Sequence, residues 1–151
     1  MKIFIDTSFF VEYFLGNEEA KDVYNLIKSK ELYTSINVVE ETTYILMKLT
    51  ASDLSNEDKH YEIIKKLKKD ERVYEICLNK ARVFYFSLIG DGVKILMPAS
   101  WDITLEMMEK YKLLPNDALI AATCKHYGIK KIATFDDDFK KVDFLEVVEI
   151  E

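Results

Sequence analysis

Acidic residues stand at four places in this 151-residue chain where an apolar stretch begins or ends. Strands end and helices begin at such boundaries, so a fold is able to gather these carboxylates. Carboxylates a few ångströms apart repel one another, and a hard divalent cation that takes oxygen ligands relieves the repulsion. The pattern therefore predicts a site for Mg²⁺ or Mn²⁺. The acidic groups are Asp6, the pair Glu40 and Glu41, Asp117, and the run Asp136, Asp137 and Asp138.

The helix that we expect from Val38 to about Leu49 distinguishes the two neighbouring glutamates. At 100° per residue, Glu41 lies on the flank of the apolar face, about 100° from its centre. Glu40 lies about 160° from that centre and is the better candidate for a water-facing residue. The pattern favours Glu41 at the site. Most helical glutamates are plain surface residues, however, and Glu40 stays open as the alternative.

Two further acidic positions are singled out by their neighbours. Pro115 suits the first turn of a helix, so Asp117 lies where the helix macrodipole stabilises an ionised carboxylate. The alternative is a plain first-turn aspartate. Asp136 lies nearest the end of an expected strand, and Asp138 points the same way if that strand continues. We therefore expect Asp136 to be the first metal ligand of this run and Asp138 an additional one, with Asp137 turned away.

Short strands and helices alternate along the chain, which indicates an α/β domain with a parallel sheet covered on both faces. Ligands bind outside the carboxyl ends of such strands. Asp6 directly follows one strand and Asp136 another, so topology predicts both at that edge. The expected strands are Lys2–Ile5, Leu32–Thr34, Lys94–Leu96, Ile132–Thr134 and Leu145–Ile150. The expected helices are Phe9–Leu15, one capped by Asn17, Val38–Leu49, one capped by Ser55 that reaches Lys69, Val73–Ile89, Asp102–Tyr111, and one from Pro115 to Gly128.

Length and composition are those of one globular domain. The chain is 49% hydrophobic and 32% charged, with a net charge of −6, which excludes a disordered or fibrous protein. No apolar run approaches the ~18–20 residues that a membrane span needs. Cys77 and Cys124 lack partners at metal-binding spacing and are typical of reduced thiols in a cytoplasmic protein. The acidic balance argues against broad electrostatic binding of nucleic acid.

Basic residues are nevertheless concentrated in one part of the sequence. The interpretation that we favour from the sequence is the solvated face of amphipathic helices. The alternative is a rim that contacts phosphates beside an acidic centre. These residues are Lys59, Lys65, Lys66, Lys68, Lys69, Arg72, Lys80 and Arg82.

At the four acidic positions the chain resembles the PIN-domain family, and most closely the VapC-type toxins of toxin–antitoxin pairs. Ile5-Asp6-Thr7-Ser8 is similar to the first family motif, and the run from Ser35 to Glu41 to the second. The third motif, an Asp followed by Ala-Leu-Ile-Ala-Ala, is matched from Asp117 to Ala122. The fourth is matched from Thr134 to Phe139, with Asp136 and Asp138 in place. The motifs occur in the family's order.

The resemblance implies a three-layer α/β sandwich with a mainly parallel five-stranded sheet, as a single nuclease domain over residues 1–151. It implies that residues 55–89 form a helical, lysine-rich stretch that shapes the substrate groove. It further implies a cytoplasmic, metal-dependent endoribonuclease that hydrolyses RNA, forms a homodimer and is held inactive by a cognate antitoxin. One or two Mg²⁺ or Mn²⁺ ions would be held by Asp6, Glu41, Asp117 and Asp136, with Asp138 as a further ligand.

Other protein classes also place an aspartate after the first strand. A phosphatase with an aspartyl nucleophile needs a second aspartate two residues later, where this chain has Ser8. A phosphorylated receiver domain needs an aspartate after a middle strand, where this chain has none. His60 and His126 fit surface positions better than a general base. Thr7, Ser8 and Thr134 are suited to orient water or carboxylates, although Ser8 also suits a helix cap. A non-catalytic RNA- or protein-binding module is the alternative to a nuclease.

Overall fold

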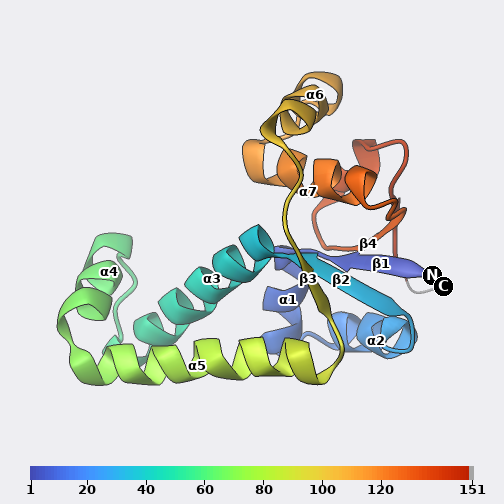
Figure 1. Cartoon of the computed structure of the whole chain (residues 1–151). Helices are drawn as coiled ribbons and strands as arrows, with labels where there is room; N and C mark the ends of the chain where they lie inside the picture. Colours follow the sequence, from blue (N-terminus) through green and yellow to red (C-terminus); the bar gives the residue numbers. More distant parts are fainter. Residues whose placement is uncertain (150–151) are drawn as a thin grey trace.

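The computed structural model describes residues 1–149, which fold around a five-stranded sheet (Figure 1). Its strands follow the order β3-β2-β1-β4-β5, and within residues 1–149 every pairing is parallel. The predicted α/β fold with a mainly parallel sheet is confirmed. The strands are β1 (Lys2–Ile5), β2 (Glu31–Ser35), β3 (Lys94–Leu96), β4 (Lys131–Ala133) and β5 (Glu146–Val147). The helices are α1 (Thr7–Phe14), α2 (Glu18–Ile27), α3 (Ile36–Ser55), α4 (His60–Lys69), α5 (Glu71–Gly90), α6 (Trp101–Tyr111), α7 (Pro115–His126) and the 3₁₀ helix η1 (Asp137–Lys141).

Strand β1 occupies the middle of the sheet and decides where the site lies. Its apolar residues Ile3–Ile5 are at most 2% exposed, as expected for a parallel strand that is covered on both faces. Ile5 pairs with Ala133, the last residue of β4. Asp6 and Thr134 consequently follow neighbouring strands at the same edge. The predicted adjacency of these two strand ends is therefore confirmed.

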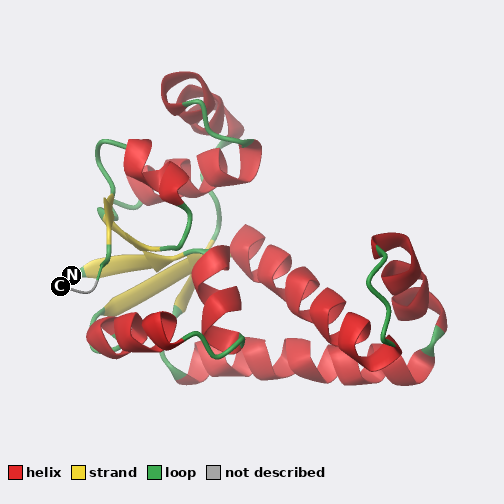
Figure 2. Ribbon diagram, turned by 180° about the vertical axis from the view of Figure 1, so that it is seen from behind, coloured by secondary structure: helices red, strands yellow, loops and turns green. Residues whose placement is uncertain are grey.

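Helices cover both faces of the sheet. Figures 1 and 2 show α1, α2 and one end of α5 on one face, and α6 and α7 on the other. Phe84 of α5 packs against Phe10 of α1 with ring centroids 5.3 Å apart. In α7, Ala118, Ala121 and Ala122 are fully buried, and such small side chains let a helix approach its neighbours closely. The result is the three-layer arrangement that was expected.

Two predicted helix boundaries around Ser55 are wrong. We predicted that one helix ends at about Leu49 and that Ser55 caps the next, but α3 continues to Ser55 as its last residue. The Ser55 hydroxyl donates to the carbonyl of Ala51 at 2.6 Å, and Asn56 ends the helix in the left-handed region with φ 52°, which asparagine tolerates better than most residues. Helix α4 begins only at His60. A serine near a helix end is ambiguous because its hydroxyl bonds to the backbone in either role.

The last two predicted strands end earlier than expected. Strand β4 ends at Ala133 rather than at Thr134, and η1 begins at Asp137. The side chain of Asp136 caps η1 by accepting a hydrogen bond from the backbone N–H of Asp138 at 2.9 Å. The turn replaces the strand continuation that would have aligned these two aspartates. Strand β5 covers two residues, and the predicted end at Ile150 lies outside the described part of the chain.

Helices α3, α4 and α5 form an arm that projects away from the sheet (Figures 1 and 2). A small hydrophobic cluster, separate from the main core, joins the three helices. Ala51, Ile63 and Cys77 are its buried centre, each at most 3% exposed. Three partly buried residues pack around that centre: Met47, Leu67 and Val73.

The state of the cysteines and the character of the helices were also predicted from the sequence. Cys77 and Cys124 are both free and buried. Among the helices of residues 1–149, none combines the length and the apolar composition that a bilayer crossing requires.

We expect the Ile63→Ala variant to loosen the arm without disturbing the sheet, because Ile63 belongs to the separate cluster. Removing its methyl groups should lower the opening free energy of α4 by about 2 kcal/mol. Hydrogen exchange would show faster exchange of α4 amides and unchanged exchange in β1. The Tyr61→Ala variant is the control, because that side chain is 80% exposed. Equal acceleration in β1 and α4 would contradict the separation of the two cores.

Candidate functional site

Asp6 is the buried centre of the predicted site. It directly follows β1, is 4% exposed, and its backbone N–H donates to the carbonyl of Ala133 at 3.1 Å. Its Oδ2 accepts hydrogen bonds from Ser8 Oγ at 2.9 Å and from Thr134 Oγ1 at 2.6 Å. Burial raises the pKa of Asp6, the two hydroxyl bonds partly offset this rise, and the negative charge of Asp136 adds to it.

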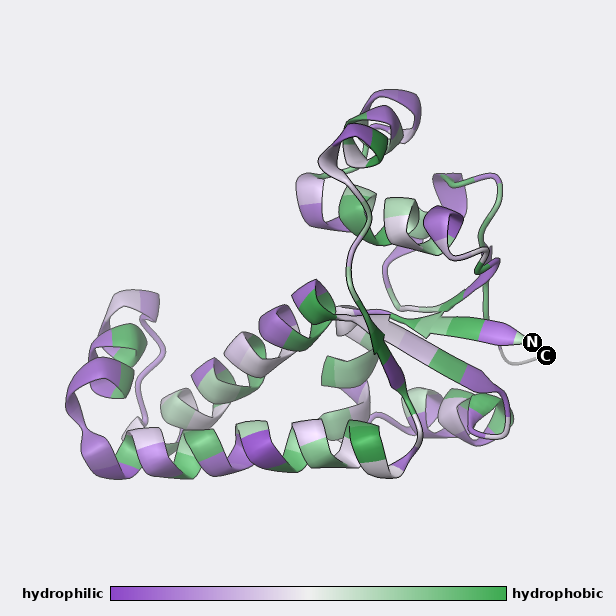
Figure 3. Ribbon diagram, in the orientation of Figure 1, coloured by the Kyte–Doolittle hydropathy of each residue, from purple (hydrophilic) through white to green (hydrophobic). Residues whose placement is uncertain are grey.

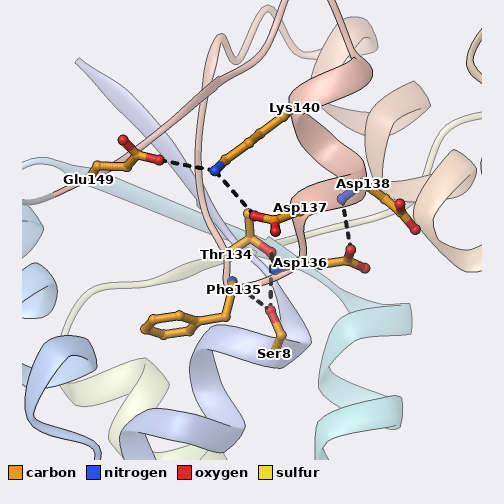
Figure 4. Close-up of polar contacts among 8 residues, drawn as sticks. All are labelled: Ser8, Thr134, Phe135, Asp136, Asp137, Asp138, Lys140 and Glu149. Carbon is orange, nitrogen blue, oxygen red and sulfur yellow. Dashed lines mark hydrogen bonds and ion pairs between the residues drawn. The ribbon is translucent and has the colours of Figure 1, made fainter.

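Ser8 and Thr134 tie the end of β1 to the turn that follows β4. Ser8 Oγ accepts from the backbone N–H of Phe135 at 2.9 Å, and Thr134 Oγ1 accepts from the backbone N–H of Asp136 at 3.0 Å (Figure 4). Each hydroxyl therefore donates to Asp6 and accepts from the turn. Ser8 does not cap the following helix, since the N-cap of α1 is Asp6. The expectation that these hydroxyls orient a carboxylate agrees with their contacts.

Asp117, Asp136 and Asp138 come together beside Asp6. One carboxylate oxygen from each of the three lies within 4.8 Å of the others. The pKa of Asp117 is raised to about 7, first by burial and then by the negative charges of Asp136, Asp6 and Asp138. Three convergent carboxylates of this kind match the oxygen ligands and the charge that Mg²⁺ or Mn²⁺ requires. The donor set thus fits the metal that the sequence predicts.

Glu41 is directed to the same region, whereas Glu40 is exposed. The Oε2 atom of Glu41 accepts a hydrogen bond from Asn116 Nδ2. Burial raises the pKa of Glu41, as do the charges of Asp6 and Glu40, and the bond from Asn116 partly offsets the rise. Asn116, the donor to Glu41, directly precedes Asp117, and the charge of Asp6 acts on Glu41, so Glu41 lies beside the acidic cluster. The choice of Glu41 over Glu40 on helical angle is consistent with this geometry.

A chain of polar side chains holds Glu41, and the sequence analysis did not identify it. Ser35 Oγ donates to Asn37 Oδ1 at 2.6 Å, and Asn37 Nδ2 donates to Asn116 Oδ1 at 3.0 Å. Asn116 in turn donates to Glu41, so the chain links the start of α3 to the start of α7. The one available signal was that Asn116 directly precedes Asp117, and it does not indicate a partner 79 residues away.

The remaining acidic and basic candidates lie away from the cluster. Asp137 is exposed and pairs with Lys140 at 3.2 Å, and Lys140 also contacts Glu149 at 3.4 Å (Figure 4). Both histidines, His60 and His126, are exposed, as expected. Five carboxylates thus share one edge of the sheet: Asp6, Glu41, Asp117, Asp136 and Asp138.

The raised pKa of Asp117 predicts how stability depends on pH without metal. Its folded pKa of about 7 exceeds the ordinary value of 3.8, so the folded state loses stability as pH rises from about 4 to 7. In EDTA, the Asp117→Asn variant should be more stable than the parent at pH 8, by about 1 to 2 kcal/mol once solvent screening of this half-buried group is considered. The gain should be smaller at pH 5.5. Urea unfolding measures both values.

Asp137→Asn is the matched control, because Asp137 is an exposed neighbour of the same chemical type. It should bring no gain that grows with pH. If the two variants behave alike, or if the gain from Asp117→Asn is equal at both pH values, the strain does not arise from Asp117.

Comparison with known proteins identifies the family. The chain matches the PIN domain over residues 3–145. It is 38% identical over 152 residues to Ribonuclease VapC2 of Methanocaldococcus jannaschii, covering 99% of this chain and 94% of that protein. It resembles the structure of Mycobacterium tuberculosis VapC20, a sarcin-ricin loop cleaving toxin, with a TM-score of 0.60 and 22% identity over 98% of this chain and 99% of that one. A toxin–antitoxin complex from Klebsiella pneumoniae gives a TM-score of 0.57 and 18% identity, with the same coverage. Fold, ordered acidic motifs and similarities agree that this chain belongs to the PIN-domain family.

Proposed function

We propose that this protein is a metal-dependent endoribonuclease and the toxin of a toxin–antitoxin pair. The observation that carries the proposal is the convergence of Asp117, Asp136 and Asp138, whose oxygens lie within 4.8 Å of one another, beside the buried Asp6. The similarity to a VapC ribonuclease over nearly the full length supports RNA as the substrate. The whole chain then acts as one nuclease domain in the cytoplasm.

Asp6, Glu41, Asp117 and Asp136 would hold one or two Mg²⁺ or Mn²⁺ ions, with Asp138 as a further ligand. A bound ion of this type lowers the pKa of a coordinated water and offsets the negative charge that develops on the phosphate. The protein's own groups orient the ligands. Ser8 and Thr134 hold one oxygen of Asp6, and Asn116 holds one oxygen of Glu41.

Two protein partners belong to the proposal. The first is a cognate antitoxin that keeps the nuclease inactive, supported by the likeness to a chain of a toxin–antitoxin complex. The second is another copy of this chain in a homodimer. Light scattering of the protein expressed alone, and together with the product of a neighbouring reading frame, measures both assemblies.

Metal-dependent RNA cleavage is the direct test. With Mg²⁺ or Mn²⁺ the parent protein should cleave single-stranded or structured RNA, and EDTA should abolish cleavage. The ions should also raise the melting temperature, because they bind the folded state. The Asp6→Asn and Asp117→Asn variants keep the side-chain shape but should lose at least 100-fold in cleavage, in line with the ~10²–10³-fold effect of removing one electrostatic stabiliser. Normal cleavage by Asp117→Asn would refute the carboxylate mechanism. A parent protein that binds RNA without cleaving it would instead be a binding module.

The hydrogen bonds that link Asn37, Asn116 and Glu41 predict a second effect on metal binding. Asn116→Ala removes the donor to Glu41, so the affinity for Mn²⁺ should fall about tenfold, as for other groups that orient metal ligands. Calorimetric titration of the free protein with Mn²⁺ measures this without RNA. Asn25→Ala, which removes an exposed amide of α2, is the control and should change nothing.

A double-mutant cycle separates orientation from a general loss of structure. In a Glu41→Gln background, adding Asn116→Ala should lower the Mn²⁺ affinity little further, because the two residues act as a unit. Fully additive losses would mean that Asn116 acts independently of Glu41.

A further inference from the structure

One part of the arm, made of α4 and the first half of α5, carries a charge opposite to that of the rest of the molecule. Residues 59–82, which we term the basic arm, contain eight Lys and Arg and four Asp and Glu, a net charge of +4. Because the chain as a whole has −6, the remainder carries −10. A polyanion is therefore attracted to the arm and repelled by most of the other surface, apart from any metal bound in the acidic cluster.

Within the described part of the chain, the lysines of α4 have no ion-pair partner. Lys65, Lys66, Lys68 and Lys69 are all exposed, and no ion pair found within residues 1–149 includes any of them. The dipole of α4 favours positive charge in its last turn. Like charges three or four residues apart on a helix nevertheless repel, and Lys65 has such neighbours in Lys68 and Lys69. An external anion would remove that repulsion.

The surface around these lysines is hollowed on two sides. A groove of about 690 Å³ lies where α4 meets α5, and Lys65, Lys66, Lys69 and Arg72 line it together with three carboxylates. One of those carboxylates, Asp70, already accepts from two backbone N–H groups of α5. A second hollow of about 480 Å³ is lined by His60, Tyr61, Ile64 and three of the lysines. The Tyr61 side chain is 80% exposed, so its ring is available for stacking.

One continuous helix, α3, connects the basic arm to the acidic cluster. Glu41 lies near the start of α3, and the helix continues from there for about 20 Å at 1.5 Å per residue before the arm turns back. Figures 1 and 2 show α4 beyond the far end of α3, and Figure 3 shows α4 and the first turns of α5 as largely hydrophilic. A stacked strand with the duplex rise of 3.4 Å per nucleotide needs about six nucleotides to cover that distance, and a more extended strand needs fewer.

We propose that the basic arm is a docking surface for the RNA backbone several nucleotides away from the bond that is cut. The lysines of α4 and Arg72 contact phosphates, and Tyr61 stacks on a base, a combination typical of proteins that bind single-stranded nucleic acid. The arm thus supplies affinity for RNA that is long enough to span from the acidic cluster to α4. This inference rests on the proposed ribonuclease function, since it assigns a second contact to the same substrate.

Two charge-matched variants test the proposal. The arm variant carries Lys65→Gln, Lys66→Gln, Lys68→Gln and Lys69→Gln. The control carries Lys28→Gln, Lys30→Gln, Lys125→Gln and Lys130→Gln, four exposed lysines outside the arm. Both lose four charges, and because all eight side chains are exposed, circular dichroism and melting temperature should match those of the parent.

Binding is measured in EDTA by fluorescence anisotropy with mixed-sequence single-stranded RNAs of 5 and 24 nucleotides. The arm variant should bind the 24-mer at least tenfold more weakly, and its slope of log affinity against log salt should fall by about 3 if each lysine meets a phosphate. The control should change affinity less than twofold. In Mn²⁺, the arm variant should show a raised KM on long RNA and an unchanged kcat.

Equal affinity of the arm variant and the control for the 24-mer would overturn the proposal. So would loss of binding to a polyglutamate peptide with RNA binding intact, because the arm would then take an acidic protein. Binding in EDTA is measured without cleavage. The docking of RNA on the basic arm can therefore be refuted independently of the ribonuclease function. Arm-dependent binding by a protein that never cleaves RNA refutes the nuclease alone, and cleavage without any effect of the arm refutes this inference alone.

Discussion

Five carboxylates from four segments of the chain meet at one edge of the sheet. Their mutual repulsion is a free-energy cost that the surrounding structure must offset. Asp6 shows how this is done, because a side chain only 4% exposed keeps two hydroxyl donors on one oxygen. Asp117 has no such donor among the hydrogen bonds of residues 1–149, and its pKa is raised to about 7. Hydrogen bonds thus partly offset the cost of a buried charge at Asp6, whereas Asp117 lacks such bonds in the described part of the chain and lies where a cation is best able to offset the repulsion.

The parallel sheet makes this arrangement possible. Because β1 and β4 are neighbours, Asp6 and the turn that carries Asp136 start from a common edge, and the backbone of that turn donates to the same Ser8 and Thr134 hydroxyls that hold Asp6. Glu41 is carried by the second turn of α3, and Asp117 by the first turn of α7. Asn116 connects these two helices through bonds to Asn37 and Glu41. The positions of Asp6 and Asp136 therefore depend on the order of the strands. The position of Glu41 relative to Asp117 depends on the hydrogen bonds of Asn37 and Asn116.

Under the proposed ribonuclease function, the uneven charge of the molecule offers RNA two different surfaces. An acidic centre repels RNA unless a divalent ion is bound, whereas a basic arm attracts it at any metal concentration. The net charge of −6 is the sum over both regions, so it does not reveal that their charges are opposite. Since α3 carries Glu41 near one end and leads to the basic arm at the other, one continuous helix sets the distance between the acidic cluster and the basic arm.

The sequence alone determined the features that follow from short-range periodicity and topology. Apolar runs located β1 and β4, a parallel sheet brings their carboxyl ends together, and the 3.6-residue period turned Glu41 rather than Glu40 toward the core edge. Only the tertiary structure decided the contacts between distant segments. The serine at position 55 fits either end of a helix, so its role depended on Asn56 adopting a left-handed conformation. The bonds among Asn37, Asn116 and Glu41 join residues more than 70 positions apart, and local pattern carries no information on partners that only chain packing brings within reach.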